Sequence, residues 1–296
     1  MKWRWDQGRL SYFQYENLTK IAYCLSTLDG VIINQNSIDP LRDELQANTH
    51  LPFAPNSYKV WRNYKRVFEC SFLATSINNR LYISDFCKKI VTQKLEVDEF
   101  ISTFVPRFRY PFPAFNDYKK SSELVYPFCA VLKYLIVKFK KGEIANITLE
   151  DIFSIIIGNN CTGIEPIEYY YNLKPTNYKP EGDEKRQVRE MMIFISQLSI
   201  LKWHGGALFL DISEKDYEAY DGFQHLITPN YKEPKEQRDE EYISMTSLSD
   251  DAIYPFKLQS RELPTDDIFI EGRRARVTHI KIERSPLLRK LFFKTF

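Results

Sequence analysis

The sequence of 296 residues has few of the residue types that build metal and redox sites. Its five cysteines form no C-x-x-C pair, and an odd number argues against a disulfide framework. Its four histidines include no adjacent pair and no H-x-x-x-H spacing, so we expect no bound metal. These residues are Cys24, Cys70, Cys87, Cys129 and Cys161, and His50, His204, His225 and His279.

Long hydrophobic runs are also missing. The longest mostly apolar stretch, Tyr126 to Phe139, contains two lysines and is too short to span a bilayer. The residues from Met1 to Asp6 do not begin a signal peptide with an apolar core, so we expect a cytoplasmic protein without membrane contact. With 44% hydrophobic and 15% aromatic residues, the chain predicts globular folding, and its length suits about two domains.

The net charge of +2 conceals an uneven distribution of charge. Twelve basic and six acidic side chains lie between Tyr58 and Lys120. Eleven acidic and four basic side chains lie between Glu214 and Asp251, which indicates a solvated linker or insertion. From Gly272 to Phe296 there are eight basic residues and a single acidic one. The two basic blocks suggest an anionic partner.

Hydrophobic periodicity predicts the same order of elements twice. In the first copy, helices over Tyr15–Leu28, Ile38–Leu45 and Tyr58–Cys70 precede a hairpin over Phe72–Ser84, whose turn is Asn78-Asn79. Ser84-Asp85 then caps a short helix ending at Val91.

The second copy also has three predicted helices. The first covers Pro127–Phe139, the second begins after the N-cap residue Thr148, and the third covers Asp183–Leu198. A hairpin over Ile200–Leu210 follows, with the turn His204-Gly205-Gly206. The residue numbers of the two copies differ by about 128. The copies therefore form a weak internal repeat.

Three helices followed by a hairpin indicate a winged helix, a variant of the helix-turn-helix motif. We therefore predict a mostly α fold with small β-hairpins, built from tandem winged-helix domains. The expected divisions are a first winged helix at 1–105, a second at 106–212, an acidic linker or insertion at 213–260, and a basic C-terminal segment at 261–296.

The third helix of a winged helix can enter the major groove of DNA, while the hairpin lies along the phosphate backbone. Arg62 and Asn63 can make two-bond contacts to guanine and adenine edges, and nearby basic groups can bind phosphates. The second unit offers a matching polar face at the start of its third helix. The predicted DNA-binding residues of the two units are Lys59, Arg62, Asn63, Lys65, Arg66 and Arg80, and Lys185, Arg186, Gln187 and Arg189.

Two further segments carry exposed-looking arginines. Arg4 lies between the indoles of Trp3 and Trp5, and Gln7 and Arg9 follow, so these three polar residues can reach a groove as an arm. We expect Trp3 and Trp5 themselves to pack the N-terminus onto the first winged helix. Arg107 and Arg109 lie in the proline-flanked connector Pro106–Pro113 and are predicted to touch phosphates. A solvated surface, or a winged helix that binds protein, is the simpler explanation for any one of these groups.

Three segments carry a resemblance to a known family. The opening Trp3 to Phe13, the segment Tyr58 to Arg66 and the phrase Pro106 to Pro113 resemble the N-terminal part of prokaryotic restriction endonucleases of the HNH type. The closing Ile280 to Lys290 looks like the lead-in to their nuclease domain. The resemblance implies a region that recognises DNA, followed by a ββα-metal unit that cuts it with Mg²⁺ or a similar divalent metal.

The sequence contains no complete nuclease centre that we can identify. The scattered histidines do not form an HNH site, so we expect the nuclease domain and its metal to be absent from this chain. Asp266, Asp267 and Glu271 form an acidic group, but the later Lys281-Ile282-Glu283 has the order of an acid-x-Lys motif reversed. We assign no catalytic and no metal-binding residue, and no cofactor, to the chain.

The element pattern and basic faces predict a module that recognises double-stranded DNA. The resemblance implies that this module belongs to a restriction-modification system acting in defence against phage, whose target DNA can carry modified bases. A homodimer would suit a palindromic site. One alternative is a non-enzymatic winged-helix regulator or defence-complex subunit, with Glu233 to Asp251 as a docking surface for protein. Another is an intact nuclease with an acidic metal site at Asp266, Asp267 and Glu271.

Overall fold

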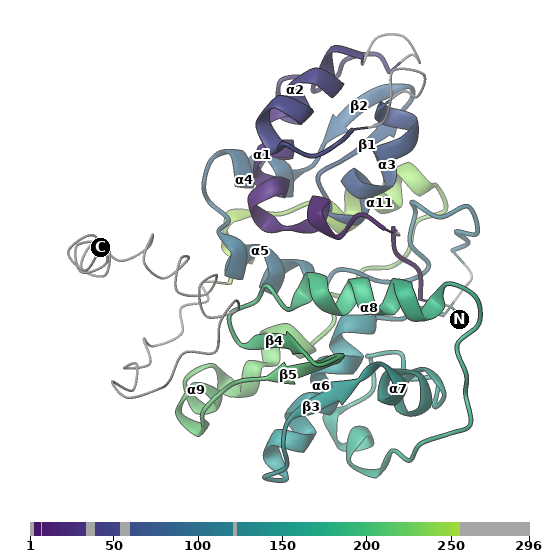
Figure 1. Ribbon diagram of the computed structural model, residues 1–296, viewed down its shortest axis with the longest axis vertical. Coiled ribbons are helices and arrows are strands. Elements are labelled where there is room, and N and C mark those ends of the chain that lie inside the picture. Colours follow the sequence, from purple (N-terminus) through teal and green to yellow (C-terminus); the bar gives the residue numbers. More distant parts are fainter. Residues whose placement is uncertain (1–2, 7, 34–38, 54–59, 121–122, 255–296) are drawn as a thin grey trace, which may run out of the picture. The chain divides into compact units, whose positions relative to one another are not determined.

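A computed structural model describes residues 3–6, 8–33, 39–53, 60–120 and 123–254 of the chain. Within these residues the fold is mostly helical, with one two-stranded and one three-stranded antiparallel sheet. The predicted fold class is therefore confirmed. Met1–Lys257 belong to one compact unit (Figure 1), while the predicted basic segment 261–296 lies outside the described residues.

The first winged-helix unit has the predicted order of elements. Ile32, which follows the first long helix, bridges antiparallel to Arg80 and so supplies a short third edge to the hairpin. Ser37 and Ile38, the predicted start of the second helix, lie outside the described residues. The elements are η1 (Leu10–Phe13), α1 (Tyr15–Ser26), α2 (Asp39–Thr49), α3 (Val60–Cys70), β1 (Ala74–Ile77), β2 (Arg80–Ile83), α4 (Asp85–Val91) and α5 (Val97–Phe104).

The second unit repeats this order with a full third strand. β3 pairs with β5, and β5 pairs with β4. β3 thus joins the hairpin of the second unit in the way that Ile32 joins the hairpin of the first. A π-helix continues the short middle helix. The elements are α6 (Pro127–Lys140), β3 (Asn146–Thr148), α7 (Leu149–Asp151), the π-helix η2 (Ile152–Ile157), η3 (Ile167–Asn172), α8 (Glu184–Ile195), β4 (Leu201–His204) and β5 (Ala207–Leu210).

Both hairpins close through two residues with left-handed backbone. Asn78 and Asn79 have φ of 49° and 60°, and Gly205 and Gly206 have φ of 58° and 80°. Two successive positive φ values match the twist of the flanking strands, and asparagine and glycine tolerate them best. His204 belongs to β4, so the predicted three-residue turn is one residue too long. The turns correspond at an offset of 127 residues (78 to 205), one fewer than predicted.

The predicted caps of α4 and α7 are confirmed. The Ser84 hydroxyl accepts a hydrogen bond from Cys87 N at 3.1 Å. At α7 the bonds are reciprocal, because Thr148 Oγ1 accepts from Asp151 N at 3.0 Å and Asp151 Oδ2 accepts from Thr148 N at 3.1 Å. This capping box satisfies two backbone donors that the helix itself cannot bond.

We expect Thr148→Ala to lower the free energy of unfolding by about 1 kcal/mol, the usual cost of losing an N-cap side chain. Thr148→Ser retains the hydroxyl and serves as the control, with a loss well below that of alanine. Equilibrium unfolding in urea measures both. Equal losses for the two variants would show that the threonine methyl, rather than the cap, carries the stability.

Aromatic side chains from both predicted winged helices share one core. Trp5 is 1% exposed, and its ring centroid lies 4.9 Å from that of Phe13, 5.4 Å from Phe108 and 5.2 Å from Phe194. Phe194, on α8, also lies edge-on to Phe104 of α5 at 5.1 Å. Trp3 and Trp5 are buried, as predicted, but Trp5 packs on residues of both units and not on the first winged helix alone.

The acidic stretch from 213 onwards is folded where the structure describes it, so its prediction as a solvated linker is wrong. Tyr242 and Met245 are buried on α11, which contacts β1 (Figure 1). Composition misled here because most of the acids occupy the exposed face of short helices while the apolar residues face the core; Asp216 and Glu241 are the buried exceptions among the acids. These helices are α9 (Glu214–Ala219), η4 (Asp221–Phe223), α10 (Gln224–Ile227), α11 (Arg238–Thr246) and η5 (Asp250–Ala252).

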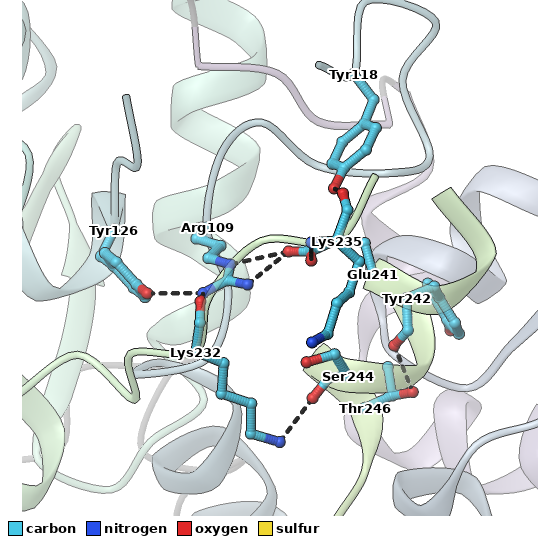
Figure 2. A network of polar contacts seen from close by, with 9 residues as sticks. All are labelled: Arg109, Tyr118, Tyr126, Lys232, Lys235, Glu241, Tyr242, Ser244 and Thr246. Carbon is cyan, nitrogen blue, oxygen red and sulfur yellow. Dashed lines mark hydrogen bonds and ion pairs between the residues drawn. The ribbon is translucent and has the colours of Figure 1, made fainter. Parts of the chain in front are cut away.

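A buried ion pair ties the connector to α11 (Figure 2). Arg109 and Glu241 are 1% and 0% exposed, and Arg109 Nη2 lies 2.6 Å from Glu241 Oε1. Arg109 Nη1 also donates to Tyr126 Oη at 3.1 Å and to the Lys232 carbonyl at 2.6 Å. Burial lowers the pKa of Arg109, but Tyr126 and Glu241 more than offset this and leave it raised, so the guanidinium stays charged.

None of the helices in the described part of the chain is both long enough and apolar enough to cross a lipid bilayer.

Candidate nucleic-acid interface

The polar face of α3 lines a groove of about 620 Å³. Four of its lining residues follow the i, i+3, i+4 spacing along one side of α3, while the opposite side buries Val60, Tyr64 and Val67 in the core. The N-terminal segment, the loop after the connector and the start of α11 supply the other walls. We call this the cationic groove; it is lined by Asp6, Arg9, Arg62, Asn63, Lys65, Arg66, Glu69, Pro113, Ala114, Asn116 and Arg238.

The charge of the cationic groove is strongly positive. Five of its lining residues are arginine or lysine, and only two are acidic. The two acids are largely buried and each has a cationic partner: Asp6 Oδ2 lies 2.8 Å from Arg9 Nη1, and Glu69 Oε1 lies 3.3 Å from Lys65 Nζ. Burial raises the pKa of Glu69, and Lys65 opposes that rise. The accessible surface of the groove therefore presents mainly cationic groups.

The side chains of the cationic groove differ in how firmly they are held. The Arg9 guanidinium lies 4.5 Å above the Tyr64 ring, and that of Arg66 lies 5.5 Å from the Phe115 ring. Arg238 donates to the Phe115 carbonyl. By contrast, the side chains of Arg62 and Asn63 make no hydrogen bond or ion pair within the described part of the chain. The two predicted base-contacting side chains are therefore the ones free to bind another molecule.

The cationic groove thus brings together five of the predicted DNA-binding residues, namely Arg9, Arg62, Asn63, Lys65 and Arg66. Gln7 and Lys59 lie outside the described residues. Two lining residues whose side chains can donate hydrogen bonds to DNA were missed: Arg238, in the stretch predicted to be a linker or insertion, and Asn116. No local sequence pattern could have placed Arg238 beside α3, because the packing of α11 onto β1 brings it there.

Arg107 and Arg109 are buried, so their predicted contact with phosphates is wrong. They are 8% and 1% exposed, and Arg107 Nη1 donates to the Thr103 carbonyl at 2.9 Å. Flanking prolines suggested an extended exposed connector, but Phe108, Tyr110 and Phe112 anchor that segment in the aromatic core. Arg107 and Arg109 alternate with these aromatic residues along the segment and are buried together with them.

Arg4 and Arg80 lie outside the cationic groove. Arg4 Nη1 is 3.0 Å from Asp117 Oδ1 in an exposed ion pair. Arg80 is exposed on the first hairpin, where its Nη1 donates to the Gly30 carbonyl at 2.9 Å. Both side chains remain accessible to solvent, and a surface ion pair of this kind is weak.

The third helix of the second unit holds the N-terminal segment in place. Gln187 Oε1 accepts from Trp5 N at 2.8 Å, and both carboxylate oxygens of Glu190 lie 3.1 Å from Gly8 N. A Cβ on Gly8 would lie 2.6 Å from Arg186 Nη2, and its φ of +75° also favours glycine. The carbonyl oxygen of the Gln187 side chain is therefore already bonded and cannot accept a hydrogen bond from a base, so the prediction that Gln187 contacts DNA is wrong for this atom.

Lys185, Arg186 and Arg189 are exposed on α8. Arg186 Nε lies 3.2 Å from Glu190 Oε1, whereas Lys185 and Arg189 make no such contact within the described part of the chain. These three groups form a second, smaller basic surface. It stays a prediction that this surface contacts DNA.

The described residues contain no group of three or more histidine, cysteine, aspartate or glutamate side chains placed to hold a metal ion. All five cysteines are free and buried, and burial raises the pKa of Cys87 and Cys129 to about 12. Such thiols are unreactive at neutral pH.

Comparison with known proteins gives a match in structure alone. No protein-family model and no curated protein matches the sequence. Among solved structures, the chain is similar to the BpuJ1 endonuclease binding domain, which was crystallised in complex with pyrene- and phenanthrene-modified DNA. The TM-score is 0.58 at 10% sequence identity, covering 83% of this chain and 96% of that domain. The described fold therefore resembles that of a DNA-binding domain of a restriction endonuclease.

Proposed function

We propose that the chain recognises double-stranded DNA as the recognition part of a restriction endonuclease, and that the cationic groove faces the duplex. The observation that carries this is the groove itself. Four of its five cationic side chains suit phosphates, whereas the fifth, Arg62, and the neighbouring Asn63 are unpaired and suit base edges. Both lie on the third helix of a winged-helix unit, the element that enters the major groove in this class of motif.

The fold similarity supports the same proposal, because the matched domain binds DNA. The finer assignment, to an HNH-type parent enzyme that acts in restriction-modification and phage defence, rests on the sequence resemblance described above. This assignment includes the proposal that the nuclease domain of the parent enzyme uses a divalent metal to cut DNA. Binding by a homodimer to a palindromic site also remains a proposal, which sedimentation with a duplex would test.

Salt dependence of binding tests the proposed function. If the four groove cations other than Arg62, together with Arg80 on the first hairpin, each neutralise one phosphate, log K should fall with log salt at a slope of about −4.5. Titrations of labelled duplex at several concentrations of potassium acetate measure this slope. A flat response would remove the DNA proposal and favour the regulator that binds protein, with Glu233 to Asp251 as its surface.

A nuclease with an acidic metal site is the other alternative, and Asp266, Asp267 and Glu271 lie outside the described residues. We expect the chain alone to leave plasmid DNA intact in Mg²⁺ or Mn²⁺, with modified and unmodified plasmids tested in parallel. The sequence supplies no complete pairing of metal ligands and general base. Cleavage that is lost in Asp266→Ala or Asp267→Ala would establish the alternative.

A further inference from the structure

A second cavity lies beneath the connector, between it and α11. It encloses about 10 Å³, enough for a single water-sized particle. Asn230 N donates to the Pro106 carbonyl at 2.8 Å, which joins the two segments at its edge. We call it the connector cavity; it is lined by Arg107, Arg109, Asn230, Lys232, Ser244 and Met245.

The lining of the connector cavity contains three cationic groups and no acid. The ion-pair partner of Arg109, Glu241, has both carboxylate oxygens bonded: its Oε1 accepts from Arg109 Nη2 at 2.6 Å and its Oε2 accepts from Lys235 N at 2.9 Å. Glu241 therefore compensates the charge of Arg109 (Figure 2), while two positive charges remain at the cavity.

Arg107 is the least satisfied of these groups. It is 8% exposed, its Nη1 donates to the Thr103 carbonyl, and its Nε has no hydrogen-bond partner. It forms no ion pair with any residue that the structure describes. Burial lowers the pKa of Arg107 to about 10, which leaves the guanidinium protonated at neutral pH. A buried cation with an unbonded N–H group destabilises the fold unless another group accepts its hydrogen bond and balances its charge.

Lys232 adds positive charge at the same place. Its Nζ donates to the Ser244 carbonyl at 2.8 Å, an uncharged acceptor. Burial lowers the pKa of Lys232, and the neighbouring Arg107 and Arg109 lower it further. The two arginines are thus close enough to disfavour a third cation, and a negative charge in the cavity would relieve all three groups.

We propose that the connector cavity binds one small monovalent anion of the halide class, which accepts a hydrogen bond from Arg107 Nε. A water molecule could accept the same bond but would leave the excess of positive charge in place. The volume suits a halide better than the larger phosphate, sulfate or carboxylate groups. The bound anion holds the connector against Asn230 and α11, and it stabilises the folded chain by mass action.

Bromide provides a direct probe because its anomalous scattering identifies it in a crystal. We expect crystals of the full chain soaked in sodium bromide to show an anomalous peak within hydrogen-bonding distance of Arg107 Nε. A peak confined to exposed lysines and arginines, with none in the connector cavity, would overturn the proposal. This test needs neither a variant nor DNA, so its failure would leave the proposed function untouched.

A solution experiment assigns the effect to Arg107. Exchanging sodium gluconate for sodium bromide at constant ionic strength should raise the melting temperature, and the rise should grow with the logarithm of bromide concentration. Arg107→Met should lose this dependence. Arg189→Met, which removes an exposed arginine from α8, is the matched control and should keep it. An unchanged melting temperature across the wild-type series would also overturn the proposal.

Discussion

Replacing Arg62 or Asn63 by alanine is expected to lower the ratio of specific to non-specific DNA affinity. Each can make a two-bond contact with a purine, and the loss of one such contact costs about 1–3 kcal/mol, or about 5- to 150-fold in that ratio. Both project from the first turn of α3 into the cationic groove, and neither has an intramolecular partner in the described part of the chain. Removing them should therefore leave the fold intact while relaxing the preference at one base position each.

Arg80→Ala is the matched control for this experiment. Arg80 lies on the hairpin outside the cationic groove and bonds only to a backbone carbonyl, so we assign it to a phosphate. Its loss should weaken binding to all sequences alike and reduce the salt slope by about one. Lys65→Ala is a poorer control, because Lys65 is the cationic partner of the buried Glu69.

Selection of bound duplexes from a random library, run on the wild type and on each variant, measures the preference. An unchanged preferred sequence after substitution of Arg62, Asn63 and Arg186 together would disprove readout by the third helices. Gln187 is left in place because it bonds Trp5 N of the N-terminal arm. Base recognition would then belong to the N-terminal arm from Arg4 to Arg9. Of that arm, Arg9 already lines the cationic groove.

Local pattern was enough to find the three main helices and the hairpin of each unit, although it missed β3 and α5. The helical face of Val60, Tyr64 and Val67, the Asn78-Asn79 turn and the Thr148 cap each depend on neighbouring residues alone. For the same reason the polar face of α3, and with it most of the cationic groove, could be predicted. These features need no knowledge of what packs against them.

The sequence failed where distant residues decide the environment. Arg109 looks exposed between prolines, yet it is buried because Glu241, 132 positions away, provides a carboxylate for it. The acidic stretch looks solvated, yet α11 packs against β1 and delivers Arg238 to the cationic groove. Pairing of a buried arginine with a remote glutamate leaves no periodic signal in either segment.

Breaking the buried Arg109–Glu241 pair should have the largest effect on stability of any single change considered. We expect Arg109→Met to lower the free energy of unfolding by about 3–5 kcal/mol, because it leaves the fully buried Glu241 carboxylate without its cation. The double variant Arg109→Met with Glu241→Leu removes both charges, and it should regain most of that loss since a buried ion pair can often be replaced by apolar residues of similar volume.

Urea unfolding of the wild type, both single variants and the double variant completes a double-mutant cycle. The expected coupling energy is favourable and of the order of 3 kcal/mol, the upper part of the range for residues in direct contact. Neither residue lines the cationic groove, so variants that remain folded should keep the wild-type salt slope for DNA. A single-variant loss below about 1 kcal/mol, within the range of a surface ion pair, would show that water compensates Glu241 and that the pair is not enclosed in solution.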